Sequence, residues 1–203
     1  RLQGDWSSDV CSSDLGLNQT ATIGFTTNLI TWDQEVVDLL REFSGVNLGM
    51  SIESFDPIND YVRWPSTLPQ VHETLEKWLN IAKEHSWLTQ FRITPTVLTI
   101  HGLLGIYQYA WDHDIAVESC NFLDQPEVMR PSVMPITHRQ SIIDNMNNWI
   151  AEHIINADQI VNIRDPGVAK QQIVQDLRSY VQYLKHQPDQ SEKLPDQIGR
   201  AHV

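Results

Sequence analysis

Four short runs of apolar and β-branched residues alternate with stretches of helical periodicity, and this alternation limits the folds open to the chain. The runs are Thr22–Thr27, Val46–Glu53, Phe91–Thr99 and Ile115–Phe122. Parallel strands need a long crossover between them, usually a helix. Strands that alternate with helical segments therefore predict consecutive βαβ units and an α/β fold with mainly parallel strands.

The segments between the runs have the residue spacing of amphipathic helices. A helix is predicted after residues 31–33, where Asp33 supplies a cap, and others over Leu68–His85 and Leu103–Trp111. Beyond the fourth run the pattern changes. Thr137–Ala157 and Asp165–Lys185 are predicted as two long helices with no strand between them.

Composition excludes several classes of protein. The chain has 203 residues, of which 41% are hydrophobic and 20% charged, as in a globular protein with a buried core. Its 26 acidic and 14 basic residues give a net charge of −12, which argues against a general nucleic-acid binder. No apolar run is long enough to span a membrane. We expect a cytoplasmic protein without nucleic-acid or membrane partners.

One DNA sequence, read on opposite strands, accounts for both ends of the chain. GACGTGTGCTCTTCCGATCT encodes residues 9–15, and its reverse complement encodes residues 198–203. This DNA resembles a sequencing-library adapter. We therefore interpret residues 1–15 as an adapter-derived artefact. Residues 187–203, rich in Pro, Gln, Asp and Ser, are predicted to be a disordered tail that ends in adapter-derived residues.

Polar residues end all four apolar runs. In parallel α/β folds ligands bind at the carboxyl ends of the strands. Each polar residue alone is explained by the preference of Ser, Thr and Asn for turns. Together, at four successive strand ends, they favour a site for one polar ligand. The residues are Thr27, Asn28, Ser51, Glu53, Thr96 and Asn121.

Five motifs occur in a fixed order along the same region. Residues 27–28 (TN) end the first run where a family pattern has T-N-G, and VNLGMSIES at 46–54 matches v-x-l-S-I-D. YVRWP at 61–65 matches Y-I-R-x-P, TPTV at 94–97 begins the next strand match, and 126–135 resembles P-x-y-L-s-i-x-x-L-P. In this order and spacing the chain resembles the radical S-adenosylmethionine family, in particular its members with a twitch domain.

The resemblance covers roughly residues 20–136 and implies a partial (β/α) barrel. Residues 16–135 would form its later βα units, followed by C-terminal helices over 136–186. The resemblance also implies S-adenosylmethionine and a [4Fe–4S] cluster as cofactors of the parent enzyme. In the family, reductive cleavage of S-adenosylmethionine yields a deoxyadenosyl radical that abstracts hydrogen from a substrate, here unknown. The cluster-binding motif C-x3-C-x2-C is missing from this sequence, so we interpret the chain as a truncated and inactive fragment.

The resemblance assigns roles to four residues. Ser51 and Glu53 would face the ribose hydroxyls or the methionine moiety, Arg63 would pair with the methionine carboxylate, and Asn28 would hydrogen-bond the cofactor. Glu53 stands where the family has Asp, and Leu29 where it has Gly after Asn. From the residues alone, Asn28 could simply close its turn. Arg63 could equally form a salt bridge, for which the acidic candidates are Asp56 and Asp60.

Two other classes stay open. The parent could be another α/β barrel enzyme, such as a metal-dependent hydrolase, or a non-catalytic scaffold that kept the fold and lost the cluster.

The acidic segment 111–114 (WDHD) could indicate a metal site, but adjacent positions do not share a helix face, which favours a surface patch. Cys120 is expected to be a packed thiol. Since an incomplete barrel leaves a strand edge unpaired, we expect aggregation or marginal stability.

Overall fold

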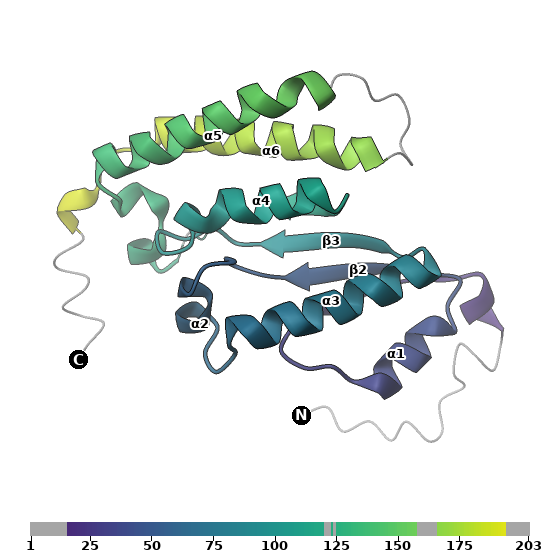
Figure 1. Ribbon diagram of the computed structural model, residues 1–203. Helices are drawn as coiled ribbons and strands as arrows, with labels where there is room; N and C mark the ends of the chain where they lie inside the picture. Colours follow the sequence, from purple (N-terminus) through teal and green to yellow (C-terminus); the bar gives the residue numbers. More distant parts are fainter. Residues whose placement is uncertain (1–15, 120–122, 124, 158–165, 194–203) are drawn as a thin grey trace.

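The computed structural model describes residues 16–119, 123, 125–157 and 166–193 as an α/β fold (Figure 1). Its four strands lie in the sheet in the order in which they occur in the chain, and all neighbours are parallel. The α/β class and the parallel sheet are thus confirmed. The strands are β1 (Thr22–Thr27), β2 (Gly45–Ser51), β3 (Leu88–Ile93) and β4 (Ala116–Ser119).

Helices connect successive strands, and two more follow the sheet. In the C-terminal pair, α5 and α6 pack along each other, and α6 also contacts α4 and β4 (Figure 1). The helices are α1 (Gln34–Arg41), α2 (Ile58–Val62), α3 (Leu68–His85), α4 (Leu103–Asp112), α5 (Ile136–Ala157) and α6 (Pro166–His186). Short 3-10 turns occupy Leu17–Gln19, Ile100–Gly102, Glu127–Met129, Pro131–Val133 and Ser191–Lys193.

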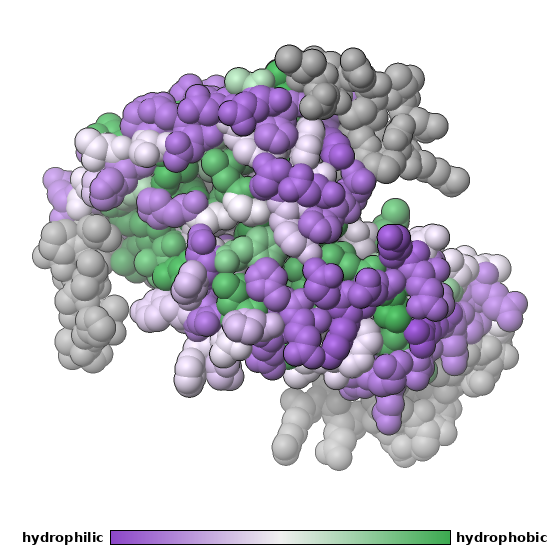
Figure 2. Space-filling view, viewed as in Figure 1, coloured by the Kyte–Doolittle hydropathy of each residue, from purple (hydrophilic) through white to green (hydrophobic). Residues whose placement is uncertain are grey.

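Each strand has an apolar side that faces the helices, because successive side chains point to opposite faces of a sheet. Phe25 of β1 packs against Trp78 of α3, with ring centroids 5.5 Å apart, and Phe91 of β3 packs against Tyr109 of α4 at 6.0 Å. Figure 2 shows hydrophilic side chains over the outer surfaces of α3 and α5, with hydrophobic ones between the helices. The strand residues of the core are Ile23, Phe25, Val46, Leu48, Met50, Phe91, Ile93 and Val117.

A buried polar cluster joins α4 to α6. The rings of Tyr107 and Tyr180 meet edge to face at 6.2 Å, and the carboxyl group of Asp176 is buried beside them. Burial, and then the neighbouring Tyr180 and Asp176, raise the pKa of Tyr107 well above its usual value. The Tyr107 hydroxyl therefore stays protonated at neutral pH.

Local signals explain why α1 begins where predicted and why α3 has its predicted bounds. The carboxylate of Asp33 accepts the backbone N–H groups of Glu35 and Val36 at 2.9 and 3.3 Å, and so caps α1. Helix α3 has Pro69 in its first turn and ends before Ser86, whose φ of 55° is the left-handed conformation that commonly closes a helix.

The third strand ends earlier than predicted. We expected a strand over Phe91–Thr99, but β3 covers Leu88–Ile93. The hydroxyl of Thr96 accepts the backbone N–H groups two and three residues later, at 3.2 and 3.3 Å. This local turn diverts the chain from the sheet into the following 3-10 helix, which is the physical reason for the difference.

Residues 187–193, the first part of the segment expected to be a disordered tail, contact α5 and the turn before it. The buried Arg139 of α5 donates through Nη1 to the carbonyl oxygens of Gln187 and Pro188, at 2.9 and 3.2 Å. The backbone N–H of Gln190 donates to the carbonyl of Ser132 at 3.2 Å. A buried cation thus holds this segment against the beginning of α5.

Some sequence predictions lie outside the described residues. These concern Cys120, Asn121, residues 1–15 and residues 194–203. Within the described ranges, none of the helices is both long enough and apolar enough to cross a membrane.

Replacing Arg139 by Met should release the segment after α6. A hydrogen bond to a charged group contributes about 1.5–3 kcal/mol, so hydrogen exchange at the Gln190 amide should accelerate roughly tenfold or more. Mass-spectrometric or NMR hydrogen exchange measures this rate. The matched control is Arg178→Met, because Arg178 is exposed on α6. Equal exchange rates in the two variants would show that Arg139 does not hold the segment.

Candidate functional site

A cavity of about 410 Å³ opens at the carboxyl end of β1. Its walls come from the end of β1 and the loop that follows, from the last residue of β2, and from α1 and α3. Asn28 and Ser51, two of the four residues predicted to bind a cofactor, line it. Because the carboxyl ends of parallel strands meet at one edge of the sheet, residues 23 positions apart reach the same space.

Side chains close the turn after β1. The hydroxyl of Thr27 accepts the backbone N–H of Leu29, and the Asn28 Oδ1 accepts that of Ile30, both at 3.1 Å. The turn role of Asn28, which the sequence left open, is therefore present, and the amide oxygen is engaged. Leu29 is buried with a φ of 61°, in the left-handed region that favours glycine. This is the position where the family pattern has Gly.

Glu53 and Arg63 pair with each other. Arg63 Nη2 lies 2.8 Å from Glu53 Oε1, and the two side chains are only 17% and 19% exposed. The second carboxylate oxygen accepts the backbone N–H of Thr94 at 3.4 Å. The salt-bridge candidates considered for Arg63, Asp56 and Asp60, were wrong. Glu53 instead ties the end of β2 to the end of α2 and to the residue after β3.

The four predicted residues therefore divide into two pairs. Asn28 and Ser51 share the cavity, whereas Glu53 and Arg63 form an ion pair that begins two residues beyond Ser51 and is not part of the cavity lining. Thr96 does not join either pair, because its hydroxyl lies 3.1 Å from that of Thr99 and serves the local turn. The Nε–H of Arg63 is buried and has no hydrogen-bond acceptor among the residues that the structure describes.

Sequence reasoning missed three polar residues on the face of the sheet opposite the helices. Arg92 Nε lies 2.8 Å from Glu118 Oε2, and Gln90 Nε2 donates to the same oxygen at 3.2 Å. These residues are recognisable in the sequence as polar side chains at alternate positions of two otherwise apolar strands. The prediction considered polar residues at strand ends, and its third strand began at Phe91, three residues after the first residue of β3.

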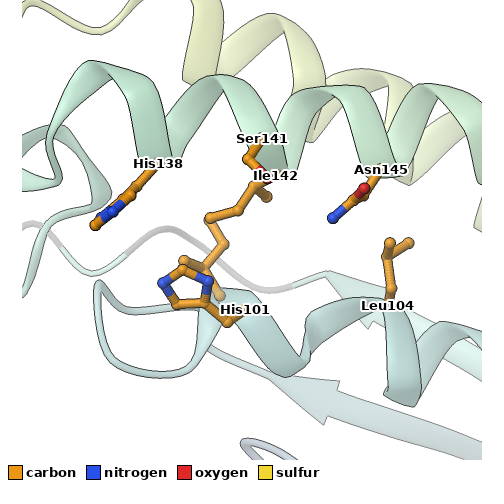
Figure 3. Close-up of a pocket in the computed structure, with 7 residues that line it drawn as sticks. His101, Leu104, His138, Ser141, Ile142 and Asn145 are labelled. Carbon is orange, nitrogen blue, oxygen red and sulfur yellow. The ribbon is translucent and has the colours of Figure 1, made fainter.

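A smaller hollow of about 110 Å³ lies between α5 and the beginning of α4. Figure 3 shows His138 reaching from α5 toward the segment that carries His101, with Ser141 and Asn145 on the same helix. In the part of the chain that the structure describes, no three His, Cys, Asp or Glu side chains gather where they could hold a metal ion.

The acidic segment 111–114 has partners within the fold. Gln108 Nε2 donates to both carboxylate oxygens of Asp112 at 3.0 Å, and Lys170 Nζ lies 2.9 Å from Asp114 Oδ1. Both acidic side chains are thus engaged in contacts with neighbouring helices or within their own helix, as the surface-patch interpretation expects.

Comparisons with protein-family models, with curated proteins and with solved structures find no match to this chain. The resemblance of residues 20–136 to the radical S-adenosylmethionine family therefore stays a prediction. The functional argument depends on the geometry of the cavity and of the Glu53–Arg63 pair.

The Glu53–Arg63 pair should stabilise the fold measurably. Glu53→Gln and Arg63→Met should each lower the free energy of unfolding by about 1–3 kcal/mol, because each leaves a largely buried charge without its opposite charge. The double variant should lose less than the sum of the two. Urea denaturation measures all four free energies.

The matched control is the exposed pair Lys77 and Glu73, whose side-chain nitrogen and oxygen lie 2.7 Å apart within α3. Exposed pairs contribute little, so the same double-variant cycle should show no measurable coupling there. Equal coupling in the two pairs would contradict a special role for Glu53 and Arg63.

Proposed function

We propose that this chain supplies the later βα units of the partial (β/α) barrel of a radical S-adenosylmethionine enzyme. The observation that carries the proposal is the meeting of Asn28 and Ser51 at one cavity beyond the carboxyl ends of β1 and β2. The order β1-β2-β3-β4, with helices on one face, supports it, because a barrel is built by adding each βα unit beside the last.

The cavity residues suit the polar groups of S-adenosylmethionine. The hydroxyl of Ser51 can donate and accept a hydrogen bond, which matches a ribose diol. The amide oxygen of Asn28 is taken by its turn, so this residue would act through its NH2 group. The residues therefore fit a small molecule with several hydrogen-bonding oxygens.

Arg63 is proposed to hold the methionine carboxylate, and Glu53 to position Arg63. The ion pair fixes one side of the guanidinium through Nη2, and none of the described residues offers an acceptor to the buried Nε–H. A ligand carboxylate would satisfy that donor through a charge-assisted hydrogen bond. In this proposal Glu53 does not meet the ribose, which is a change from the role that the resemblance implied.

The residues of this chain do not fit a [4Fe–4S] cluster. The sequence has two cysteines, Cys11 and Cys120, in place of the three closely spaced cysteines of the family. When bound, the cluster would supply the electron that cleaves S-adenosylmethionine. This chain alone is therefore proposed to bind the cofactor without cleaving it, so it is inactive as it stands.

S-adenosylhomocysteine should bind the 203-residue chain, and Ser51→Ala should weaken that binding. Loss of one neutral hydrogen bond corresponds to a decrease in affinity of roughly threefold to tenfold. Titration calorimetry or ligand-observed NMR measures the affinity. Ser179→Ala, on the exposed side of α6, is the matched control and should bind as the unchanged chain does. Binding that ignores the Ser51 change would contradict the proposed site.

Anaerobic reconstitution with ferrous iron and sulfide should leave the chain without a stable cluster, because two distant cysteines cannot replace a C-x3-C-x2-C motif. Iron analysis and the visible absorption spectrum check this outcome. Cys120→Ser should retain as little iron as the unchanged chain. Incorporation of about four irons per chain with a strong cluster absorption band would refute the prediction.

A further inference from the structure

The face of the sheet opposite the helices carries two rows of residues that run across the strands. One row is Thr26, Gly49, Gln90 and Ala116, and the next, nearer the carboxyl ends, is Ser51, Arg92 and Glu118. Parallel sheets are ordinarily covered on both faces. Here Thr26, Asn47 and Glu118 are exposed, and none of the described helices packs over this face.

Arg92 lies across the sheet above Gly49. A Cβ atom at position 49 would stand 3.0 Å from Arg92 Nε and 2.9 Å from Thr26 Oγ1, and the second distance is shorter than Cβ atoms tolerate. The absence of a side chain at Gly49 therefore makes room for the guanidinium at this level of the sheet. The feature is local, because a Cβ at Gly24, on the same face of β1, would meet no atom within 4 Å.

The pairing of Arg92 with Glu118 leaves both groups accessible. The Nε and Oε2 atoms lie 2.8 Å apart, but the N–H of Nε is not directed at the oxygen, and the side chains are 41% and 46% exposed. A pair this exposed contributes little to stability. Its position beside Ser51, at the carboxyl end of an uncovered parallel sheet, is where α/β folds bind ligands.

We infer that Arg92 and Glu118 bind the zwitterionic head of an α-amino acid, with the carboxylate on Arg92 and the ammonium on Glu118. The two side chains offer one positive and one negative group a few ångströms apart, which matches the spacing within such a head group. A phosphate dianion would face the Glu118 carboxylate uncompensated, and a simple cation would face Arg92. A zwitterion leaves neither charge unpaired.

As a substrate site this inference rests on the proposed function, because the helix-free face of the strands would be the interior face of the barrel, whose active site lies at the carboxyl ends of the strands. Binding itself requires neither the cluster nor further strands. S-adenosylmethionine also carries an α-amino acid head, which the proposed function assigns to Arg63. The experiment therefore compares the binding of a free amino acid at Arg92 with the binding of a cofactor analogue there.

Arginine footprinting on the 203-residue chain tests the inference. Phenylglyoxal modifies accessible arginines, and peptide mass spectrometry reads the rate at Arg92. Millimolar L-alanine should slow modification of Arg92 severalfold, whereas N-acetylalanine amide, which lacks both charges, should have no effect. Glu118→Gln should abolish the protection. Gly49→Ala, which displaces Arg92, should abolish it too, and Gly24→Ala should retain it.

Four results would overturn the inference: no protection of Arg92 by alanine, equal protection by the uncharged amide, full protection in Glu118→Gln, or protection by S-adenosylhomocysteine but not by alanine. Circular dichroism checks that Gly49→Ala is folded. If that variant is unfolded, the Glu118→Gln result decides, because Glu118 is exposed. Failure of the proposed function would appear instead as lost dependence of S-adenosylhomocysteine binding on Ser51.

Discussion

The alternation of side chains along four neighbouring parallel strands is the constraint on which the rest of this structure depends. With the order β1-β2-β3-β4, one parity of residues from every strand forms a single apolar layer, from Phe25 to Val117. All of α1, α3 and α4 bury their apolar faces on that layer. Residues of the other parity, which include Arg92, Glu118 and the exposed Leu88, point away from that layer, and the carboxyl ends of the strands lie at one edge. Both candidate binding regions follow from this arrangement.

Glu53 connects three segments of the chain at the carboxyl edge of the sheet. Its carboxylate meets Arg63 at the end of α2 and the backbone of Thr94 after β3, so three segments are joined by one side chain. Taking a charge out of water is costly unless it is paired, so the partners must stay together once the region folds. The pairing also orients the guanidinium of Arg63. In the proposed function, one ion pair would therefore combine a stabilising contact with a binding residue.

Local signals predicted much of the fold. β1 and α3 have the predicted bounds because turn residues and caps lie at their ends. Asn28 and Ser51 could be placed at strand ends from the sequence, and both line the cavity there. Contacts between distant segments were not predictable in the same way. Such contacts depend on which strands and helices become neighbours in the fold. Examples are the pairing of Arg63 with Glu53, the hydrogen bonds of Arg139 to the segment after α6, and the Arg92–Glu118 pair.

Both outer strands of the described sheet have one strand neighbour, because β1 pairs with β2 and β4 pairs with β3. Helix α6 packs against β4. An edge strand has unpaired backbone groups that can accept a further strand, and in the proposed function the additional strands of the barrel would pair with β1. The cavity that holds Asn28 lies at this same edge. Under that proposal, strands added at β1 would enclose the cavity from its open side and exclude water from a bound ligand.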